Sequence, residues 1–352
     1  MKTTVQLTIL FFLSFFSNTL FSQDYYAGIE IGFRGIKVNI IDVRDVSKKI
    51  WVSEKAWTDY NIKESGILNT GLLSESYIQS VSKKVLENYN LLINDSKIDK
   101  SKIVIVISSG ISKATNTTIL IKKIFDLTTV NPSITTTSNE AEYVFNECVP
   151  KKLAKDCFLI NIASQNTKGG FYENQNGQSV FNDFYFKNGI LSYFEKTHNS
   201  NLNSNTTDFI KEIEANQSKL SDEIKTQVHL EEITASKKNI VFVGGAVWSF
   251  FTLYYKDNSY KEMYEIKYED ILKYDENLKN NFPDYLDYAI KDKEADKVIK
   301  TFTQQNLIAA NAILIGMLNT IKKVNSKKLF FVKLQDVPWL STYIIESLNA
   351  KK

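Results

Sequence analysis

The chain has few residues of the kinds that build metal centres, disulfide frameworks and nucleic-acid sites. Its 352 residues include two cysteines and two histidines, and only two of its 43 basic residues are arginines. A histidine-based metal site or a Ser-His triad is therefore not expected. Nucleic acid is not expected as a partner, because the formal net charge is only +3 and the basic residues are scattered. Scarce arginine also leaves few bidentate phosphate contacts.

The two cysteines, Cys148 and Cys157, leave two states open. In an oxidising compartment they would close a short loop as a disulfide, and otherwise they would be buried thiols. The remaining composition, with 43% hydrophobic and 24% charged residues, is that of a globular protein long enough for two domains.

Residues 1–22 have the pattern of a secretory signal peptide. Lys2 supplies a positive end, Leu7–Phe16 a short apolar segment, and Ser22 a small residue at the cleavage point. An uncleaved anchor is the alternative, but the polar residues in this stretch make a poor membrane span. The sequence predicts export to the periplasm or beyond, with no membrane insertion after signal cleavage.

A strand–turn–strand pattern occurs twice in the chain. In residues 27–43, two apolar strands flank the turn 32–35, where backbone N–H groups can face an anion. The pattern returns at Cys157, and Asn176-Gly177 then marks a hairpin turn. This duplication predicts two related halves facing a central cleft. The expected halves are 23–150 and 151–352, with C-terminal helices returning to the interface.

Apolar runs and helical periodicity predict the other elements. The expected strands are 50–57, 103–107, 134–137, 157–163, 169–172, 179–186, 239–242 and 329–332. The expected helices are 74–92, 118–127, one capped by Ser138 or Asn139 and ending at Asn146, 208–225, 247–254, 271–278, 297–322 and 339–348.

Six segments at strand ends and helix starts hold the candidate functional residues. They are IEIGFRG (29–35), IVISSGISKATN (105–116), SNEAEYVF (138–145), NIASQNTK (161–168), SVFNDFYFKNGI (179–190) and VFVGGAVWSFF (241–251). In this order they resemble the loops of the exopolyphosphatase and guanosine pentaphosphate phosphohydrolase family. The resemblance covers nearly the whole mature chain, from Ala27 to about Leu348.

This resemblance implies a fold and a set of partners. The family belongs to the sugar-kinase, actin and chaperone ATPase superfamily. An α/β fold is therefore implied, with two actin-like (ribonuclease H-like) halves, each a mixed sheet flanked by helices. The resemblance also implies magnesium as a cofactor, an anionic phosphate-containing ligand, and a homodimer.

Two acids match the family's functional carboxylates. Glu30 precedes Gly32 as in the first phosphate loop, and the resemblance implies that Glu30 holds a water on a metal. Glu140-Ala141 matches the segment with the general base, which would deprotonate the water that attacks a terminal phosphorus. The alternative is that Glu140 is a first-turn acid stabilised by the helix dipole, and that Glu30 caps backbone donors at a strand end.

The fourth segment departs most from the family pattern, Asp-x-Gly-Gly-Gly-Ser-Thr-Glu. Asn161 replaces the aspartate, the run 163–165 replaces the glycines, and Lys168 replaces the glutamate, while Thr167 is retained. Side chains therefore stand where close backbone approach to phosphate requires none. The lysine reverses the sign at a metal-organising position.

The other segments keep part of their pattern. Asn116 matches the family's Arg-Glu-Ala-x-Asn element, although Ser112 and Lys113 replace its arginine and glutamate. The phosphate-binding residues that the resemblance implies are Gly32, Arg34, Asn116, Thr167, Lys168, Gly244 and Gly245.

Two functions follow from this comparison. The first is an exported phosphatase that hydrolyses terminal phosphates of a polyphosphate-like substrate, with Glu140 as the base and Glu30 holding magnesium. The second is a catalytically inactive envelope protein of the same fold that binds a ligand or a partner. The number of cleft carboxylates separates them, since active members use about four acids with a glycine-lined cradle, whereas Glu30 and Glu140 remain here.

Overall fold

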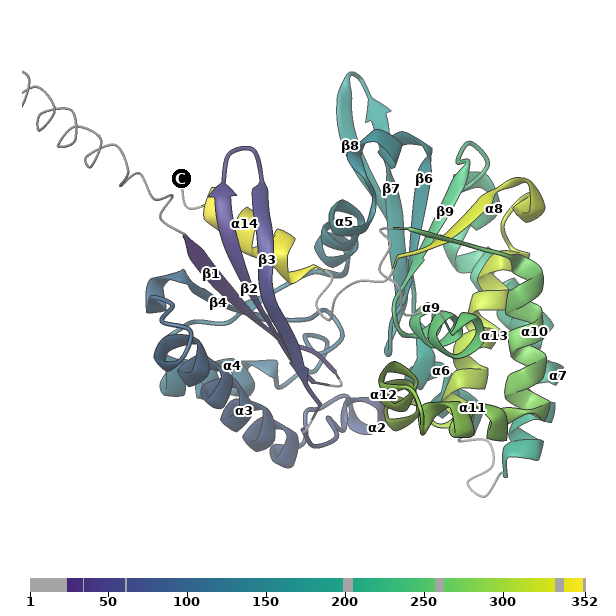
Figure 1. Cartoon of the computed structure of the whole chain (residues 1–352), viewed down its shortest axis with the longest axis horizontal. Coiled ribbons are helices and arrows are strands. Elements are labelled where there is room, and N and C mark those ends of the chain that lie inside the picture. The colour runs from purple at the N-terminus through teal and green to yellow at the C-terminus, as the bar shows by residue number, and fades with distance from the viewer. Residues whose placement is uncertain are drawn as a thin grey trace, which may run out of the picture.

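Two mixed sheets, each covered by helices, organise the chain into two lobes (Figure 1). The computed structural model describes residues 24–33, 35–60, 62–198, 205–256, 263–332 and 339–350. The predicted signal peptide (residues 1–22) and Arg34 lie outside the described residues. Within them, no helix is both long enough and apolar enough to span a bilayer.

The first sheet has the strand order β3-β2-β1-β4-β5. Its antiparallel β1–β2 hairpin is followed in space by β4, which runs parallel to β1. The strands are β1 (Tyr25–Ile31), β2 (Ile36–Asp45), β3 (Ile50–Asp59), β4 (Ile103–Ile107) and β5 (Ser133–Ile134).

The second sheet repeats this arrangement. Its order is β10-β11-β9-β6-β7-β8, with an antiparallel β6–β7 hairpin and β9 parallel to β6. When it is read from β8, its first five strands follow the order of the first sheet, and β10 is an added edge strand. The predicted duplication is therefore confirmed. The strands are β6 (Cys157–Ile162), β7 (Thr167–Gln175), β8 (Gln178–Phe186), β9 (Asn239–Val243), β10 (Tyr264–Ile266) and β11 (Lys328–Phe331).

Helices cover the outer faces of the sheets and fill the space between the lobes. In the first lobe, α3 packs on β1 and β2 and against α4, and in the second lobe α13 packs among α6, α7 and α10. The helices are α2 (Ile67–Thr70), α3 (Glu75–Asn94), α4 (Thr117–Thr128), α5 (Thr137–Cys148), α6 (Ile190–His198), α7 (Thr206–Val228), α8 (Leu230–Ile233), α9 (Gly245–Phe250), α10 (Tyr268–Asn280), α11 (Phe282–Ala289), α12 (Lys293–Thr301), α13 (Gln304–Asn319) and α14 (Leu340–Asn349).

The prediction of a single helix over 297–322 is wrong, because this range holds two helices, α12 and α13, with an interruption at residues 302–303. Thr303 caps α13, since its hydroxyl accepts a hydrogen bond from the Asn306 amide at 3.2 Å, and the Asn306 side chain accepts from the Thr303 amide at 3.3 Å. This reciprocal capping satisfies donors that a continuous helix would bond internally. The helices α2, α6 and α11 and the strand β10 were not predicted.

The start of α5 also differs from the prediction. Its cap is Thr136, whose hydroxyl accepts from the Asn139 amide at 3.0 Å, rather than Ser138 or Asn139. The expected strand 134–137 is accordingly limited to Ser133–Ile134. Glu140 therefore lies in the first turn of the helix and is buried.

A buried cluster joins the two lobes. The helix α5 packs on β7 and β8 of the second sheet, whereas α14, at the end of the chain, packs on β1 and β2 of the first. A Cβ atom added at Gly28 would lie 2.7 Å from Leu340 Cδ1, so only glycine allows this close approach. Cys148 and Cys157 belong to the same cluster as free, buried thiols, and burial raises the pKa of both.

A half-buried acid, Glu147, lies between α5 and α14. The Thr342 hydroxyl donates to Glu147 Oε2 at 2.8 Å, and burial raises the pKa of Glu147 from its usual value of 4.5 to about 7. Between about pH 4.5 and pH 7, Glu147 is protonated in the folded chain and ionised in the unfolded chain. The protonated acid therefore stabilises the fold at low pH, and this contribution is lost as the pH rises through 7.

Replacing Glu147 with glutamine should remove this pH dependence. Relative to wild type, Glu147→Gln should gain roughly 3 kcal/mol in the free energy of unfolding between about pH 4.5 and pH 8. Urea unfolding at several pH values measures this difference, and Glu75→Gln, at an exposed site in α3, is the control. A difference that stays constant with pH would contradict the raised pKa.

Candidate functional site

The cleft between the lobes lies where the two hairpin turns meet. Gly32, Phe33 and Gly35 in the turn of β1–β2 and residues 163–166 in the turn of β6–β7 line a cavity of about 280 Å³. The start of α9 closes one end of it. In each sheet the first strand runs parallel to a central strand, β1 to β4 and β6 to β9. The residues that follow the carboxyl ends of these strands line the cavity, which is the usual place for a ligand in such sheets.

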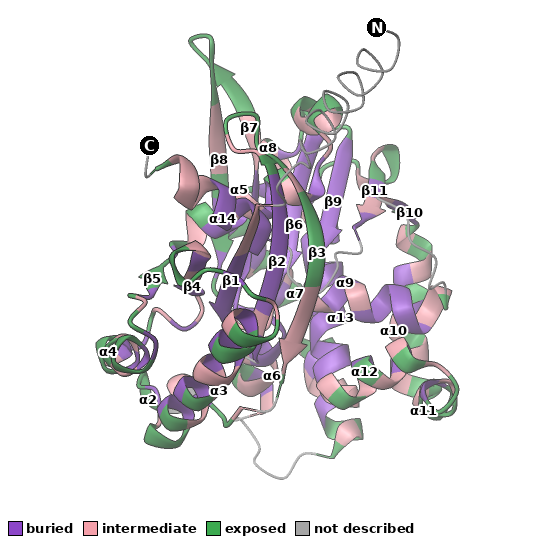
Figure 2. Ribbon diagram, turned by 60° about the vertical axis from the view of Figure 1, so that its left-hand side comes forward, coloured by how far each residue is buried: buried purple, intermediate pink, exposed green. Residues whose placement is uncertain are grey.

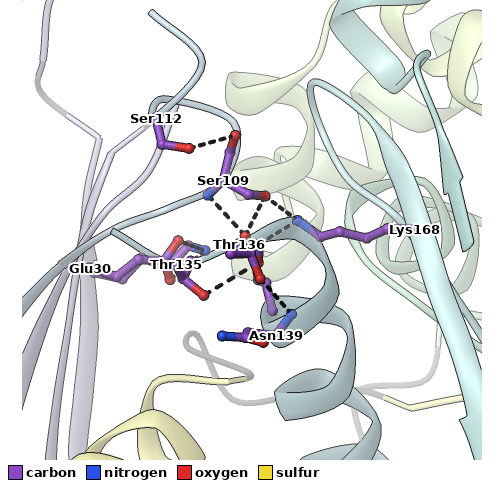
Figure 3. Close-up of polar contacts among 9 residues, drawn as sticks. Glu30, Ser109, Ser112, Thr135, Thr136, Asn139 and Lys168 are labelled. Atoms are coloured by element: carbon purple, nitrogen blue, oxygen red, sulfur yellow. Dashed lines mark hydrogen bonds and ion pairs between the residues drawn. The ribbon is translucent and has the colours of Figure 1, made fainter. Parts of the chain in front are cut away.

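A buried ionic contact crosses this cleft. Lys168 Nζ, from β7, lies 2.5 Å from Glu140 Oε1 and 3.1 Å from Ser109 Oγ, which follows β4 (Figure 3). The amide and hydroxyl of Ser109 donate to Glu140 Oε2 at 3.0 and 2.6 Å. The side chains of Lys168 and Glu140 are only 3% and 8% exposed.

These contacts keep the Glu140 carboxylate ionised. Burial favours the neutral acid, but the Lys168 ammonium and the hydrogen bonds from Ser109 outweigh burial and lower the pKa of Glu140. Both carboxylate oxygens are engaged by protein donors. The lowered pKa makes Glu140 a weak base, whereas a general base that works near neutral pH needs a raised pKa.

The second acid of the cleft is also paired with a lysine. Lys37 Nζ lies 3.1 Å from both oxygens of Glu30. Burial raises the pKa of Glu30, and the Lys37 charge offsets this only in part. Burial disfavours the charge on Lys37, but the Glu30 carboxylate outweighs it and raises the pKa of Lys37.

The two lysines occupy equivalent places in the two hairpins. Glu30 is the register partner of Lys37 in β1–β2, and Asn161 is the register partner of Lys168 in β6–β7. In the first hairpin the lysine therefore binds the acid opposite it. In the second hairpin that acid is replaced by Asn161, and Lys168 reaches Glu140 instead.

The structure separates the predicted phosphate-binding residues into two groups. Gly32, Lys168, Gly244 and Gly245 line the cavity, as do Glu30 and Glu140. The predictions for these residues and for Arg34 stay untested. Asn116 and Thr167 lie outside the lining, and both are engaged within the fold.

Asn116 and Thr167 hold backbone segments in place. The Asn116 side chain accepts from the Leu73 amide at 2.8 Å and donates to the Leu73 carbonyl at 2.9 Å. The Thr167 hydroxyl, fully buried, donates to the Asn188 carbonyl at 2.9 Å. Their presence in the motif is thus explained by packing and backbone satisfaction.

Packing also accounts for Gly244 and Gly245. Gly244 has a φ of 97°, and an added Cβ would lie 2.5 Å from both Asn161 Oδ1 and the Ile162 carbonyl oxygen. An added Cβ at Gly245 would lie 2.9 Å from the Phe302 ring. The pair is required where the end of β9 meets β6 and the chain turns into α9.

Sequence reasoning missed Lys37, Ser109 and the aromatic lining of the cavity, in which Trp248, Phe302 and Trp339 take part. A signal for Lys37 was available, because a four-residue turn at 32–35 places residue 37 opposite residue 30. The aromatic residues come from separate elements of the second half of the chain, and their meeting depends on the tertiary fold.

The described side chains do not fit a magnesium site. Across the described ranges, no group of three or more His, Cys, Asp or Glu side chains could hold a metal ion. Glu30, the predicted metal residue, has both oxygens within hydrogen-bond distance of Lys37. Magnesium prefers several oxygen ligands in octahedral geometry, which a lysine-paired carboxylate does not supply.

Solved structures share this fold over nearly the whole chain. A Ppx/GppA enzyme from Aquifex aeolicus is 14% identical, with a TM-score of 0.66 over 91% of this chain and 98% of its own. An exopolyphosphatase-like protein is 13% identical, with a TM-score of 0.67 over 93% and 99%. An exopolyphosphatase from Cytophaga hutchinsonii is 11% identical, with a TM-score of 0.63 over 92% and 98%.

At the level of sequence, no family model and no curated protein matches the chain. The likeness is therefore one of architecture: two mixed-sheet lobes around a cleft, extending over almost all of each compared structure. It confirms the predicted resemblance in fold. The chain has the fold of the Ppx/GppA exopolyphosphatases.

Proposed function

We propose that this chain is an exported protein of the exopolyphosphatase fold that binds a ligand or partner in its cleft without hydrolysing phosphoanhydrides. The observation that carries the proposal is the pairing of both cleft carboxylates with lysines, Glu140 with Lys168 and Glu30 with Lys37. A general base must present an oxygen to water. Here the oxygens of both acids face ammonium or hydroxyl donors.

The charges that line the first cavity also support the proposal, because they do not favour the binding of phosphate. Lys37 and Lys168 are the lysines that line the cavity, and both are bound to glutamate. A phosphate that approached them would have to displace a carboxylate and leave that carboxylate buried without its counter-charge, which is costly. The predicted phosphate ligand thus meets no unpaired ammonium among the described residues that line this first cavity.

The ancestral activity remains the second candidate. It is favoured by the position of Glu140, which lines the cleft at a helix start as the family pattern requires, and by the similarity of the fold to exopolyphosphatases. Opening of the Lys168–Glu140 pair on substrate binding would free the carboxylate for catalysis.

Phosphate release from long-chain polyphosphate distinguishes the two candidates. The mature protein should release no phosphate above the blank with magnesium or with EDTA, because its carboxylates are paired. A cooperative thermal melt establishes that the sample is folded. Magnesium-dependent release that Glu140→Gln abolishes would contradict the proposal and establish a phosphatase.

The Lys168–Glu140 pair should contribute strongly to stability as a unit. Lys168→Met leaves the Glu140 carboxylate buried without its partner and should lower the free energy of unfolding by about 3–5 kcal/mol at neutral pH. The double variant Lys168→Met/Glu140→Gln should recover most of this loss, because no charge remains buried. Urea unfolding measures both, and additive effects of the two substitutions would show that the pair is not coupled.

Export is the third part of the proposal and has a direct measurement. After expression in a bacterial host, the protein in the periplasmic or secreted fraction should begin at Gln23 on N-terminal sequencing. A full-length chain that remains in the membrane fraction would favour the uncleaved anchor instead.

A further inference from the structure

We infer that the cleft receives an extended polypeptide segment of a partner protein, which adds to the free edge of β3 and places an apolar side chain between the lobes. This inference rests on the proposed binding function. Four features support it: a second cavity, an open strand edge, unpaired amide groups and an apolar lining.

The second cavity adjoins the first and enlarges the cleft. It has a volume of about 600 Å³ and shares Phe33, Tyr60 and Thr301 with the first cavity. It extends the cleft from the hairpin turns along Tyr60 and residues 62–66 toward α6 and α12. Because the two cavities share lining residues, an elongated ligand such as a chain segment can contact both.

The strand β3 borders this space with an open edge. It is the last strand of its sheet and lies on the side of the first lobe that faces the second lobe (Figures 1 and 2). Much of its length is exposed, whereas β1 and β2 are buried (Figure 2). Such an edge offers backbone donors and acceptors to another strand.

The register of β3 shows which backbone groups face outward. An added Cβ at Gly35 would lie 2.7 Å from the Asp59 carbonyl oxygen, so this carbonyl points toward β2. Backbone groups alternate in direction along an antiparallel strand, and those of Thr58 therefore point to the free edge. Thr58 also lines the first cavity, and its buried hydroxyl has no hydrogen-bond partner in the described structure.

Two amide side chains on the opposite wall are also unsatisfied. Gln165 Nε2 and Asn166 Oδ1 are buried in the cavity lining, and neither has a partner in the described part of the chain. One is a donor and the other is an acceptor, which is the pair of groups that a peptide main chain presents. Buried unsatisfied polar groups are rare in folded proteins and costly, so a ligand that pairs with them gains affinity.

The lining of the second cavity suits an apolar side chain. Phe33, Ile62, Leu191 and Phe194 contribute its apolar surface. Its charged residues have both signs, with Lys63, Lys297 and Lys300 against Glu64 and Glu195. This mixture does not select for a polyanion. It matches an uncharged main chain that carries an aromatic or aliphatic residue, the usual chemistry of strand addition.

The experiment begins with selection from a random peptide library on the mature protein. A selected peptide, labelled with a fluorophore, is titrated with the protein and followed by anisotropy. Backbone N-methylation is then scanned along the peptide. Strand addition predicts that methylation at alternate residues weakens binding by about tenfold, while the residues between them tolerate it, because only every second amide faces β3.

A variant of the protein tests the same contact from the other side. Thr58→Pro removes the outward N–H and should weaken binding by about tenfold, whereas Thr58→Val keeps that N–H and should have a smaller effect. A cooperative melt verifies folding of both variants, and the N-methyl scan stands without either of them. Uniform sensitivity to methylation, unchanged binding by folded Thr58→Pro, or no peptide tighter than about 100 μM would overturn the inference.

These outcomes are separate from those of the phosphate assay. If the protein releases no phosphate and binds no peptide, the peptide inference is wrong, but the proposal that the protein does not hydrolyse phosphoanhydrides stands. A protein that hydrolyses polyphosphate loses the proposed function whatever it binds. If polyphosphate binds without displacing a selected peptide, the anion binds outside the peptide site and the inference stands. If polyphosphate binds and no peptide does, the inference is wrong.

Discussion

The cleft depends on the rule that a buried charge must be paired. Lys168 and Glu140 are both nearly inaccessible to water, and each would be costly alone. Their contact, with Ser109 between them, connects β7 of the second sheet to α5 and to the loop after β4. The relative placement of the two lobes at this point is thus determined by an electrostatic requirement in addition to apolar packing.

The duplicated hairpins explain why the pairing takes this form. The positions of Glu30 and Lys37 in one hairpin correspond to those of Asn161 and Lys168 in the other. Where the acid is present, the lysine stays within its own hairpin. Where asparagine replaces the acid, the lysine needs another carboxylate and binds Glu140. The contact between Lys168 and Glu140 thus follows from Asn161 standing at the place that Glu30 takes in the first hairpin.

Much of the fold was predictable, because local patterns determine it. The run 103–107 and the Asn176-Gly177 turn identified strands at the places where they occur, and the repeated hairpin predicted two similar sheets. The prediction of one helix over 297–322 was wrong because Phe302 continues the apolar pattern of a helix. Thr303 nevertheless caps a new helix, α13, and this local capping overrides the apolar periodicity. The contact of Ser109, Glu140 and Lys168 was beyond sequence reasoning, since it depends on how the lobes meet.

A fold can persist after its site has changed, because the core and the cleft obey different constraints. Gly28 is required by the packing of α14, and Gly244 and Gly245 by the packing around α9, so the fold needs these glycines whether or not phosphate binds. The cleft, in contrast, has its charges neutralised and its amides on Gln165 and Asn166 left unsatisfied. A site without a ligand gains nothing from leaving buried amides unpaired, because any substitution that satisfies or removes them would stabilise the fold. The paired lysines and the unpaired side-chain groups of Gln165 and Asn166 would suit the uncharged main chain of the peptide proposed for this cleft.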